Sequence, residues 1–350
     1  MPRETDIIDR KYFAPSYEDV LAQVWAFYLR IAAHLQPDIC EDRVPPATAR
    51  RIKKVADAIY ERRQKASGLK LLKEDQRELV KELAQAGGML VGPMTCHEVD
   101  EWAAALHEET PWMADLNTRL MKHQRAQIRA SRTGLLLPPL LLVGKPGNGK
   151  SGYARMIGEM VGAPVREIDV GSGAASFRIS GVEKGWGTST PGIPIEMMLT
   201  DKIANPVIVV NEVCKMPGRV GSTTGTVTTL TTALLQVLEK DTAARFECPV
   251  HRIRFNLSHI NWVLTANDLD MVSAPLRDRC LVFEMPEVTP EVAALMFDTL
   301  AKKYIGRIDP DLLAMARAEV IAAAATSDVS LRQIIRILEI LASDEPPTLH

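Results

Sequence analysis

The sequence predicts an α/β fold: a parallel sheet flanked by helices, with an all-helical N-terminal region and a helical C-terminal subdomain. Short, continuously apolar runs recur in the middle of the chain, and helical segments separate most of them. Strands that are apolar on both faces and alternate with helices are typical of a parallel sheet covered on both sides. The expected strands are residues 140–143, 165–170, 207–210, 260–264 and 281–283.

Before and after this sheet, apolar residues recur at helical spacing. Ser16 with Asp19 three residues later predicts a capped helix start, and Thr95 with Glu98 predicts another. Gly87 is expected to end a helix as its C-cap. Helices are therefore expected over residues 16–35, 47–65 and 69–85, from 95, over 111–129, and again from 286 to 340.

The helix expected over 47–65 has an apolar face formed by Ile52, Val55 and Ile59. Its other face is strongly basic and comprises Arg50, Arg51, Lys53, Lys54, Arg62, Arg63 and Lys65. Such a run is most often a solvated helix face, and nucleic-acid binding is the alternative.

Composition narrows the class of protein. The chain has 350 residues, and at roughly 150 residues per domain this length suggests two domains. The formal net charge of −2 gives no reason to expect nucleic-acid binding by bulk electrostatics. The five cysteines include no CxxC pair, which argues against a zinc site of the usual spacing and against a secreted disulfide framework. The sequence has no signal-peptide pattern and no apolar run long enough to span a bilayer, so we expect a cytoplasmic protein outside the membrane.

Residues 144–151 read GKPGNGKS and fit the phosphate-binding pattern G-x-x-x-x-G-K-[ST]. They follow an expected strand and precede a helix expected over 152–161, which argues against a chance match in a glycine-containing turn. Lys150 would contact the β- and γ-phosphates, and Ser151 would bind Mg²⁺. The predicted nucleotide-binding residues are Gly144, Lys145, Pro146, Gly147, Asn148, Gly149, Lys150, Ser151 and Gly152.

A second polar motif, Asn211-Glu212, directly follows the apolar strand 207–210. Ligands bind at the carboxyl ends of strands in open α/β sheets, so Glu212 is a candidate general base for an attacking water. Asn211 stands where aspartate is usual, and it keeps the carbonyl oxygen but lacks the charge. We therefore expect weaker cation binding and slower turnover. The alternative is a core strand followed by polar residues without a catalytic role.

From residue 140 to about 339, the chain resembles the ATPase module of Lon-type AAA+ proteins. Besides the two motifs above, the resemblance rests on collinear segments at 166–170, 177–181, 185–192, 234–239, 265–267 and 274–279. It implies a P-loop AAA+ fold with a helical lid, ATP and Mg²⁺ as cofactors, and ATP hydrolysis. It also implies a homo-oligomeric ring, a hexamer in this family, that acts on a protein client.

The resemblance also implies roles for single residues. Asn267 matches the residue that orients the attacking water, and Arg279 matches the arginine that reaches the γ-phosphate of a neighbouring subunit. Arg332 matches the lid arginine, with Arg336 as the alternative if the register shifts. The predicted catalytic residues are Glu212, Asn267, Arg279 and Arg332, and the predicted metal-binding residues are Ser151 and Asn211. A turn-capping asparagine and a surface salt bridge are the structural alternatives for Asn267 and Arg279.

Trp186 and Gly187 stand at the place of the family's pore loop, where an aromatic residue grips a translocating polypeptide. Trp186 lies between glycines in a segment without helical or strand periodicity, which favours an exposed loop over local packing. Gly187 departs from the aliphatic residue usual in the family. The threonine-rich segment 218–228 is expected to be either a second pore loop or a surface loop.

We expect three parts: a helical N-terminal module over 1–110, an AAA+ α/β subdomain over 111–285 and a helical lid over 286–345. Lon proteases continue beyond the lid into a protease domain, whereas this sequence ends at His350. We therefore expect no protease domain, so that proteolysis would need a separate peptidase or other partner protein.

Three functional hypotheses follow. The first is a Lon-like AAA+ ATPase that hydrolyses Mg·ATP at subunit interfaces to remodel or translocate a protein client. The second is an ATP-binding switch or scaffold with weak or no hydrolysis, because the acidic motif carries Asn211. The third is a DNA-associated motor, whose only support is the basic helix face.

Overall fold

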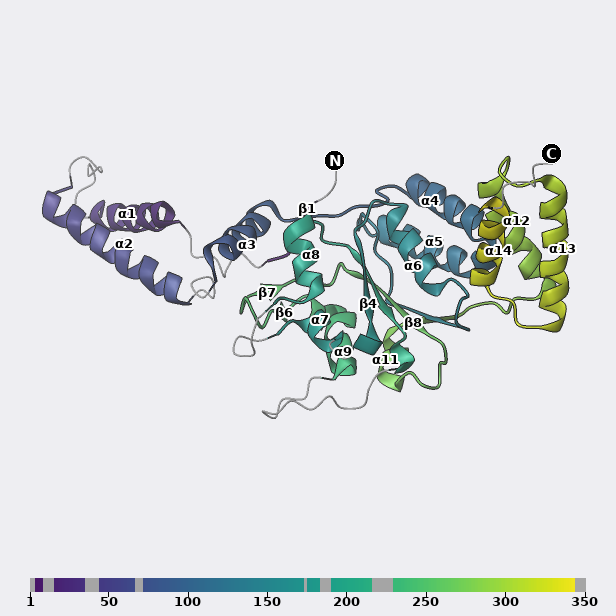
Figure 1. The fold of residues 1–350 in the computed structure, drawn as a ribbon. Helices are drawn as coiled ribbons and strands as arrows, with labels where there is room; N and C mark the ends of the chain where they lie inside the picture. The colour runs from purple at the N-terminus through teal and green to yellow at the C-terminus, as the bar shows by residue number, and fades with distance from the viewer. Residues whose placement is uncertain are drawn as a thin grey trace.

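A computed structural model describes residues 4–8, 16–34, 44–66, 72–172, 175–182, 190–215 and 229–343 (Figure 1). Its centre is a five-stranded parallel sheet with the strand order β4-β5-β8-β3-β9. The strands are β3 (Leu140–Val143), β4 (Val165–Asp169), β5 (Val207–Asn211), β8 (Asn261–Ala266) and β9 (Leu281–Glu284). All five lie within one residue or two of the expected runs, and the α/β fold class is confirmed.

The sheet is apolar on both faces because both faces are covered by helices. Along β5, Ile208 and Val210 belong to one buried cluster, whereas Val207 and Val209 belong to another. The first cluster includes residues of α7 (Ala175–Ser180), α8 (Ile193–Asp201), α9 (Leu230–Leu238) and α11 (Ala274–Arg279). The second includes residues of α4 (Cys96–Glu109), α5 (Ala114–Arg129) and α6 (Lys150–Glu159).

The first two helices, α1 (Tyr17–Ala32) and α2 (Pro46–Ala66), pack against each other and project from the body at one end of the molecule (Figure 1). The predicted capping box is present, because Ser16 Oγ accepts from the Asp19 backbone and the Asp19 carboxylate accepts from the Ser16 backbone. Ile52 is buried, but Val55 is 49% exposed, so the predicted apolar face of α2 is narrower than expected. The basic residues Arg50, Arg51, Lys53, Lys54, Arg62 and Arg63 are all exposed.

The third helix, α3 (Glu74–Ala86), begins later than residue 69, where we expected it to start. It ends as expected at Gly87, which has a φ of +73° and donates its N–H to Leu83 O. The helix packs on α8, and Lys202 at the end of α8 forms an ion pair with Glu82 at 2.8 Å.

Helices α4 and α5 form an antiparallel pair that lies on the sheet. Pro111–Met113 is a 3-10 turn, so α5 starts at Ala114 and not at the expected residue 111. Two buried asparagines at the amino ends of strands bind the residues before α4 and after α5. Asn205 Nδ2 donates to Val91 O at 2.7 Å and to Leu135 O at 3.0 Å. Asn261 Nδ2 donates to the same Leu135 O at 3.1 Å.

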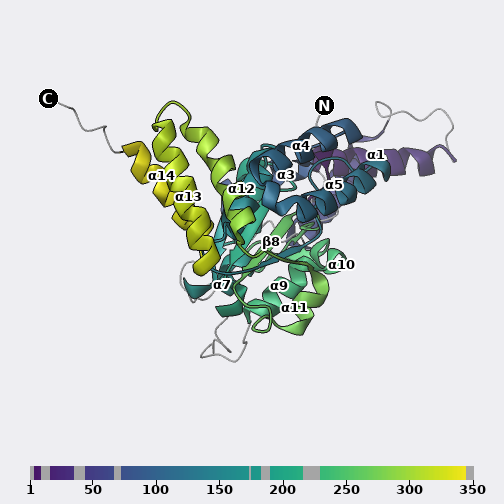
Figure 2. The same cartoon turned by 90° about the vertical axis from the view of Figure 1, so that its right-hand side faces the viewer.

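Three helices form a separate C-terminal bundle with its own buried cluster: α12 (Pro290–Ala301), α13 (Pro310–Thr326) and α14 (Leu331–Ser343). Figure 2 shows them grouped on one side of the molecule, next to α4. Arg317 of α13 binds both carboxylate oxygens of Asp298 in α12, at 2.6 and 2.9 Å. We call this bundle the lid.

The remaining elements are short. They are the strands β1 (Glu4–Thr5), β2 (Gly88–Met89), β6 (Phe246–Glu247) and β7 (Arg254–Phe255), the helix α10 (Lys240–Ala243), and 3-10 turns at Val170–Ser172, Val213–Lys215 and Lys302–Tyr304. Among the residues that the structure describes, no helix is both long and apolar enough to cross a membrane.

Candidate functional site

The loop between β3 and α6 is the tight turn that its sequence predicted. Gly147 and Gly149 have φ values of +85° and +84°, a backbone conformation that residues other than glycine rarely adopt. Because α6 begins at Lys150, the first N–H groups of the helix face the loop and have no partner within the helix. A Cβ on Gly152 would meet nothing within 4 Å, so the first turn of α6 borders open space. These features suit an anion.

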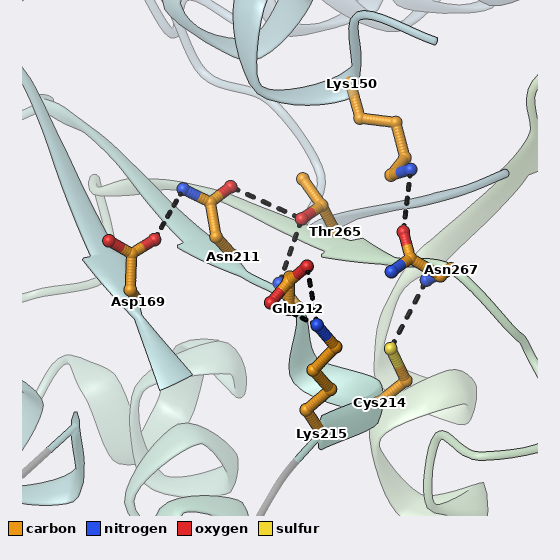
Figure 3. A network of polar contacts seen from close by, with 8 residues as sticks. All are labelled: Lys150, Asp169, Asn211, Glu212, Cys214, Lys215, Thr265 and Asn267. Atoms are coloured by element: carbon orange, nitrogen blue, oxygen red, sulfur yellow. Dashed lines mark hydrogen bonds and ion pairs between the residues drawn. The ribbon is translucent and has the colours of Figure 1, made fainter. Parts of the chain in front are cut away.

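Lys150 is the buried cation of this loop, with 8% of its surface exposed. Its ammonium donates to the carbonyl oxygens of Gly144 at 2.6 Å and Lys145 at 3.0 Å. It also donates to Asn267 Oδ1 at 3.0 Å, which joins the loop to the end of β8 (Figure 3). Burial lowers the pKa of Lys150, because the charged form loses hydration. A phosphate beside the ammonium would oppose that shift.

Asn211 lies at the carboxyl end of β5, beside the first turn of α6. Its Oδ1 accepts a hydrogen bond from Ser151 Oγ at 2.7 Å and one from Thr265 Oγ1 at 3.3 Å. Its Nδ2 donates to Glu167 Oε2 at 2.7 Å and to Asp169 Oδ1 at 3.2 Å. The two predicted metal-binding residues are therefore in direct contact with each other, and Asn211 is also bonded to two carboxylates on the neighbouring strand β4.

Glu212 follows at a bend in the chain. Its φ of +60° is rare for a residue with a side chain, and its N–H donates to Thr265 Oγ1 at 3.1 Å. The carboxylate forms an ion pair with Lys215 at 3.0 Å (Figure 3). Asn267, the other expected water-orienting residue, donates its N–H to Cys214 Sγ at 3.3 Å. The parallel register of β3, β5 and β8 places their carboxyl ends together, which is why these side chains meet.

The lid contacts the loop through α14 and the residues before it. The Arg332 N–H donates to Gly147 O at 3.0 Å, and a Cβ on Gly149 would lie 2.5 Å from Leu331 Cδ2. Lys145 pairs with Asp328 at 2.6 Å, and this carboxylate raises the pKa of Lys145. Arg332 therefore adjoins the loop and lines the site from the lid.

Most of these residues line a cavity of about 850 Å³, within the size range of small-molecule sites. Gly144, Lys145 and Asp328 instead line a second cavity of about 940 Å³, which shares Asn148 and Asn267 with the first. The sheet side supplies Lys150, Ser151, Asp169, Asn211, Glu212 and Asn267, and the lid supplies Leu331, Arg332, Ile335, Arg336 and Glu339. Glu109 and Trp112 complete the lining from the end of α4 and the turn after it. Trp112 also packs against both the sheet cluster and the lid cluster.

Three of the expected residues that the structure describes do not line this cavity. Two of them, Gly144 and Lys145, line the second cavity. Arg279 lines neither of the two. Its guanidinium donates to Pro275 O at 3.1 Å and pairs with Glu239 at 3.3 Å, which is the surface salt bridge considered above. Trp186, Gly187 and the segment 218–228 fall outside the described residues.

The cavity suits a hydrated Mg²⁺ held together with phosphates. The hydroxyl of Ser151, the amide oxygen of Asn211 and the carboxylates of Asp169 and Glu212 are all oxygen donors, which Mg²⁺ prefers. Within the described residues, no group of three or more histidine, cysteine, aspartate or glutamate side chains could hold a metal by itself. This agrees with the usual binding of Mg²⁺ through few carboxylates, waters and substrate phosphates.

The sequence reasoning did not identify Asp169, Trp112 or Glu109 as residues of the site. Asp169 ends β4 and is the register partner of Asn211, so its sequence signal was a carboxylate at the carboxyl end of an expected strand. Trp112 and Glu109 come from outside the resemblance, and no pattern in the sequence connects them with the loop.

Comparisons with known proteins agree with this geometry. Residues 140–287 match the family described as ATPase family associated with various cellular activities (AAA). Lon protease 4 of Sorangium cellulosum is 28% identical over 246 residues, which are 68% of this chain and 30% of that protein. The peroxisomal Lon protease homolog 2 of Caenorhabditis elegans is 27% identical over 66% of this chain and 29% of its own length. The chain thus spans less than a third of these relatives.

Among solved structures, the fold is similar to that described as "Closed State CryoEM Reconstruction of Hsp104:ATPyS and FITC casein". The TM-score is 0.53 at 14% sequence identity, over 81% of this chain and 50% of that one. This likeness shows the fold. Residues 140–287 thus match the AAA family of ATPases, and the same part of the chain is similar to the ATPase region of Lon proteases.

Proposed function

We propose that this protein binds and hydrolyses Mg·ATP at the interfaces of a homo-oligomeric ring, and that it uses the energy to remodel or translocate a protein client. The observation that carries the proposal is a cavity lined by the phosphate-binding loop, the carboxyl ends of β5 and β8, and the lid. Family membership supports ATPase chemistry in general, and the residue roles below are part of the proposal.

Some residues of the cavity are proposed to bind the phosphates, and others to activate the attacking water. Lys150 and the N–H groups at the start of α6 hold the phosphates, because the ammonium is buried and points to the loop. Glu212 holds a water as general base once its carboxylate turns from Lys215. Asn267, tied to Lys150, orients the same water. Arg332 places positive charge against the phosphates from the lid.

A bound Mg²⁺ would neutralise charge on the phosphate oxygens. Ser151 and Asn211 are the residues proposed to hold it, since their oxygens are 2.7 Å apart and face the same cavity. Asp169 adds a carboxylate next to them.

The proposal of a ring rests on the resemblance to Lon-type proteins, which gives Arg279 a role on the nucleotide of a neighbouring subunit. Arg279 does not line the cavity of its own chain. For that role it must exchange Glu239 and Pro275 O for phosphate oxygens. We propose a hexamer, by likeness to the family. Trp186 and Gly187 are the proposed pore loop.

The proposed division of the chain into a module over 1–110, an α/β subdomain over 111–285 and a lid over 286–345 has one complication. Trp102 and Leu106 of α4 share a buried cluster with Leu116 of α5 and with residues of the sheet. Helix α4 therefore packs as part of the α/β unit, whereas α1 and α2 form the projecting hairpin.

A switch or scaffold with slow turnover is the second candidate function. The observation that favours it is Asn211, whose amide brings no charge to the metal subsite. A DNA-associated motor has weaker support, because the exposed basic face of α2 is equally the solvated face of a hairpin.

The test is steady-state ATP hydrolysis with Mg²⁺, with the Glu212→Gln variant as blank and with the size of the same samples measured with and without ATP. We expect turnover well above the blank and ATP-dependent assembly. Tight ATP binding and assembly without turnover would instead establish the switch. Failure to bind ATP would contradict both.

A further inference from the structure

The metal subsite has an unusual distribution of charge. Its acidic motif carries a neutral amide at position 211, yet the amide lies between a hydroxyl and two carboxylates. Asn211 is 8% exposed, so water does not screen these contacts fully. Asn211 itself brings no negative charge to this subsite, so a charge on the cation's protein side must come from another residue.

The hydrogen bonds fix the orientation of the Asn211 amide. Ser151 Oγ and Thr265 Oγ1 both lie on the Oδ1 side, and Ser151 is 2.7 Å away. On the Nδ2 side lie only acceptors, the carboxylate oxygens of Glu167 and Asp169. A carboxylate at 211 has no N–H to donate, so the arrangement around β4 suits asparagine specifically.

The two carboxylates on β4 differ in their position relative to the cavity. Glu167 Oε1 forms an ion pair with Arg155 of α6 at 2.9 Å. Asp169 lies two residues further toward the carboxyl end of β4, in register with Asn211. Asp169 lines the cavity together with Ser151, Asn211 and Glu212, whereas Glu167 does not.

We infer that Asp169 supplies the negative charge of the metal subsite, and that Asn211 acts as the neutral link between Asp169 and Ser151. The inference rests on the proposed binding of Mg·ATP. In this arrangement the charge lies at the end of β4 and not at the end of β5. The Asn211 amide donates to Asp169 (Figure 3) and accepts from Ser151 on its other side. Asp169 is thus a positioning and charge-supplying residue for the cation.

A consequence distinguishes this arrangement from a simple loss of charge. If Asn211 were only a defect, Asn211→Asp would repair it. In this structure that change places a third carboxylate against Glu167 and Asp169 and removes the N–H groups between them. Like charges at this distance repel, so the single change is unfavourable, and the compensating change Asp169→Asn restores both the charge count and a donor.

The first experiment measures how much Mg²⁺ strengthens the binding of a nonhydrolysable fluorescent ATP analogue, by comparing affinities in MgCl₂ and in EDTA. Asp169→Asn is expected to reduce the strengthening by about tenfold, as for other groups just outside a metal's ligands, while affinity in EDTA stays the same. Asp241→Asn, an exposed aspartate of α10 away from the cavity, is the matched control and should change neither value.

The second experiment uses the charge swap. Asn211→Asp should lower the melting temperature, and the double variant Asn211→Asp/Asp169→Asn should recover both the melting temperature and the Mg²⁺ dependence. An unchanged Mg²⁺ dependence in Asp169→Asn, or no recovery in the double variant, overturns the inference while leaving the proposed function in place. Absence of analogue binding by the unsubstituted protein, in MgCl₂ and in EDTA alike, overturns the proposed function itself.

Discussion

The phosphate-binding loop contains two lysines with different surroundings, Lys145 and Lys150. Lys150 is buried and bonded to the loop's own carbonyl oxygens, whereas Lys145 is exposed and paired with Asp328 of the lid. A cation beside phosphates in a water-poor cavity is worth far more than one in an exposed pair. At the residue scale, we therefore expect Lys150 to bind the phosphates and Lys145 to hold the lid against the loop.

This difference gives a first prediction. Lys150→Ala should weaken ATP binding by at least about tenfold, because the phosphates lose a buried charge-assisted contact. Lys145→Ala removes the same charge from the same loop and should change affinity much less, because an exposed ion pair contributes about 0–1 kcal/mol. Equilibrium binding of a fluorescent nucleotide measures both. Equal losses in the two variants would contradict the assigned roles.

The polar contacts explain which site residues could be predicted from the sequence. Lys150, Ser151 and Glu212 belong to short motifs, so their neighbours in the sequence are also their neighbours in space. Asp169 approaches Asn211 only through the register of two strands more than forty residues apart in the chain. Pair register depends on tertiary structure, and one sequence read alone does not contain it.

At the scale of elements, the strands were predicted closely and some helix starts were not. A buried parallel strand is a continuous apolar run with polar ends, so its bounds are visible in the sequence. Helix α3 starts at Glu74 without a side-chain cap, so no capping residue marks its start in the sequence. The helix packs against α8, a contact that the sequence alone does not show.

Trp112, in the turn between α4 and α5, contacts both the sheet and the lid. Trp112 lines the cavity and packs against both the sheet cluster and the lid cluster. Trp112→Ala should destabilise the protein by about 2 kcal/mol, because a partly buried aromatic is lost, and it should also weaken nucleotide binding by loosening the lid. Thermal unfolding and nucleotide binding measure the two effects.

The control for this second prediction is Trp25→Ala. Trp25 is also partly buried, but it lies on α1 in the projecting hairpin and contacts Tyr28 edge-to-face. Its loss should affect the hairpin alone and leave nucleotide affinity unchanged. A fall in affinity for Trp25→Ala as large as for Trp112→Ala would remove the argument that Trp112 connects the lid with the site.

At the scale of the whole molecule, the separation of Glu212 and Arg279 predicts how mixed subunits behave. Glu212 lines its own chain's cavity, whereas Arg279 would serve a neighbour's. Glu212→Gln and Arg279→Ala should each abolish hydrolysis alone. Mixed in equal amounts, about a quarter of the head-to-tail interfaces would combine one intact Glu212 with one intact Arg279.

The mixture should therefore recover part of the ATPase activity, measured at steady state after exchange of subunits. Nucleotide binding by Arg279→Ala alone should stay intact, which separates a missing catalytic contact from a misfolded chain. Continued inactivity of a mixture that is shown to have assembled together would contradict the sharing of sites between subunits.

The two buried asparagines at the amino ends of the strands have a mechanical consequence. Asn205 and Asn261 bind the segment from Val91 to Leu135 across the edge of the sheet opposite the phosphate-binding loop. We therefore expect a tensile load applied to the chain before Val91 to reach the sheet through these hydrogen bonds, at the edge away from the nucleotide-binding residues.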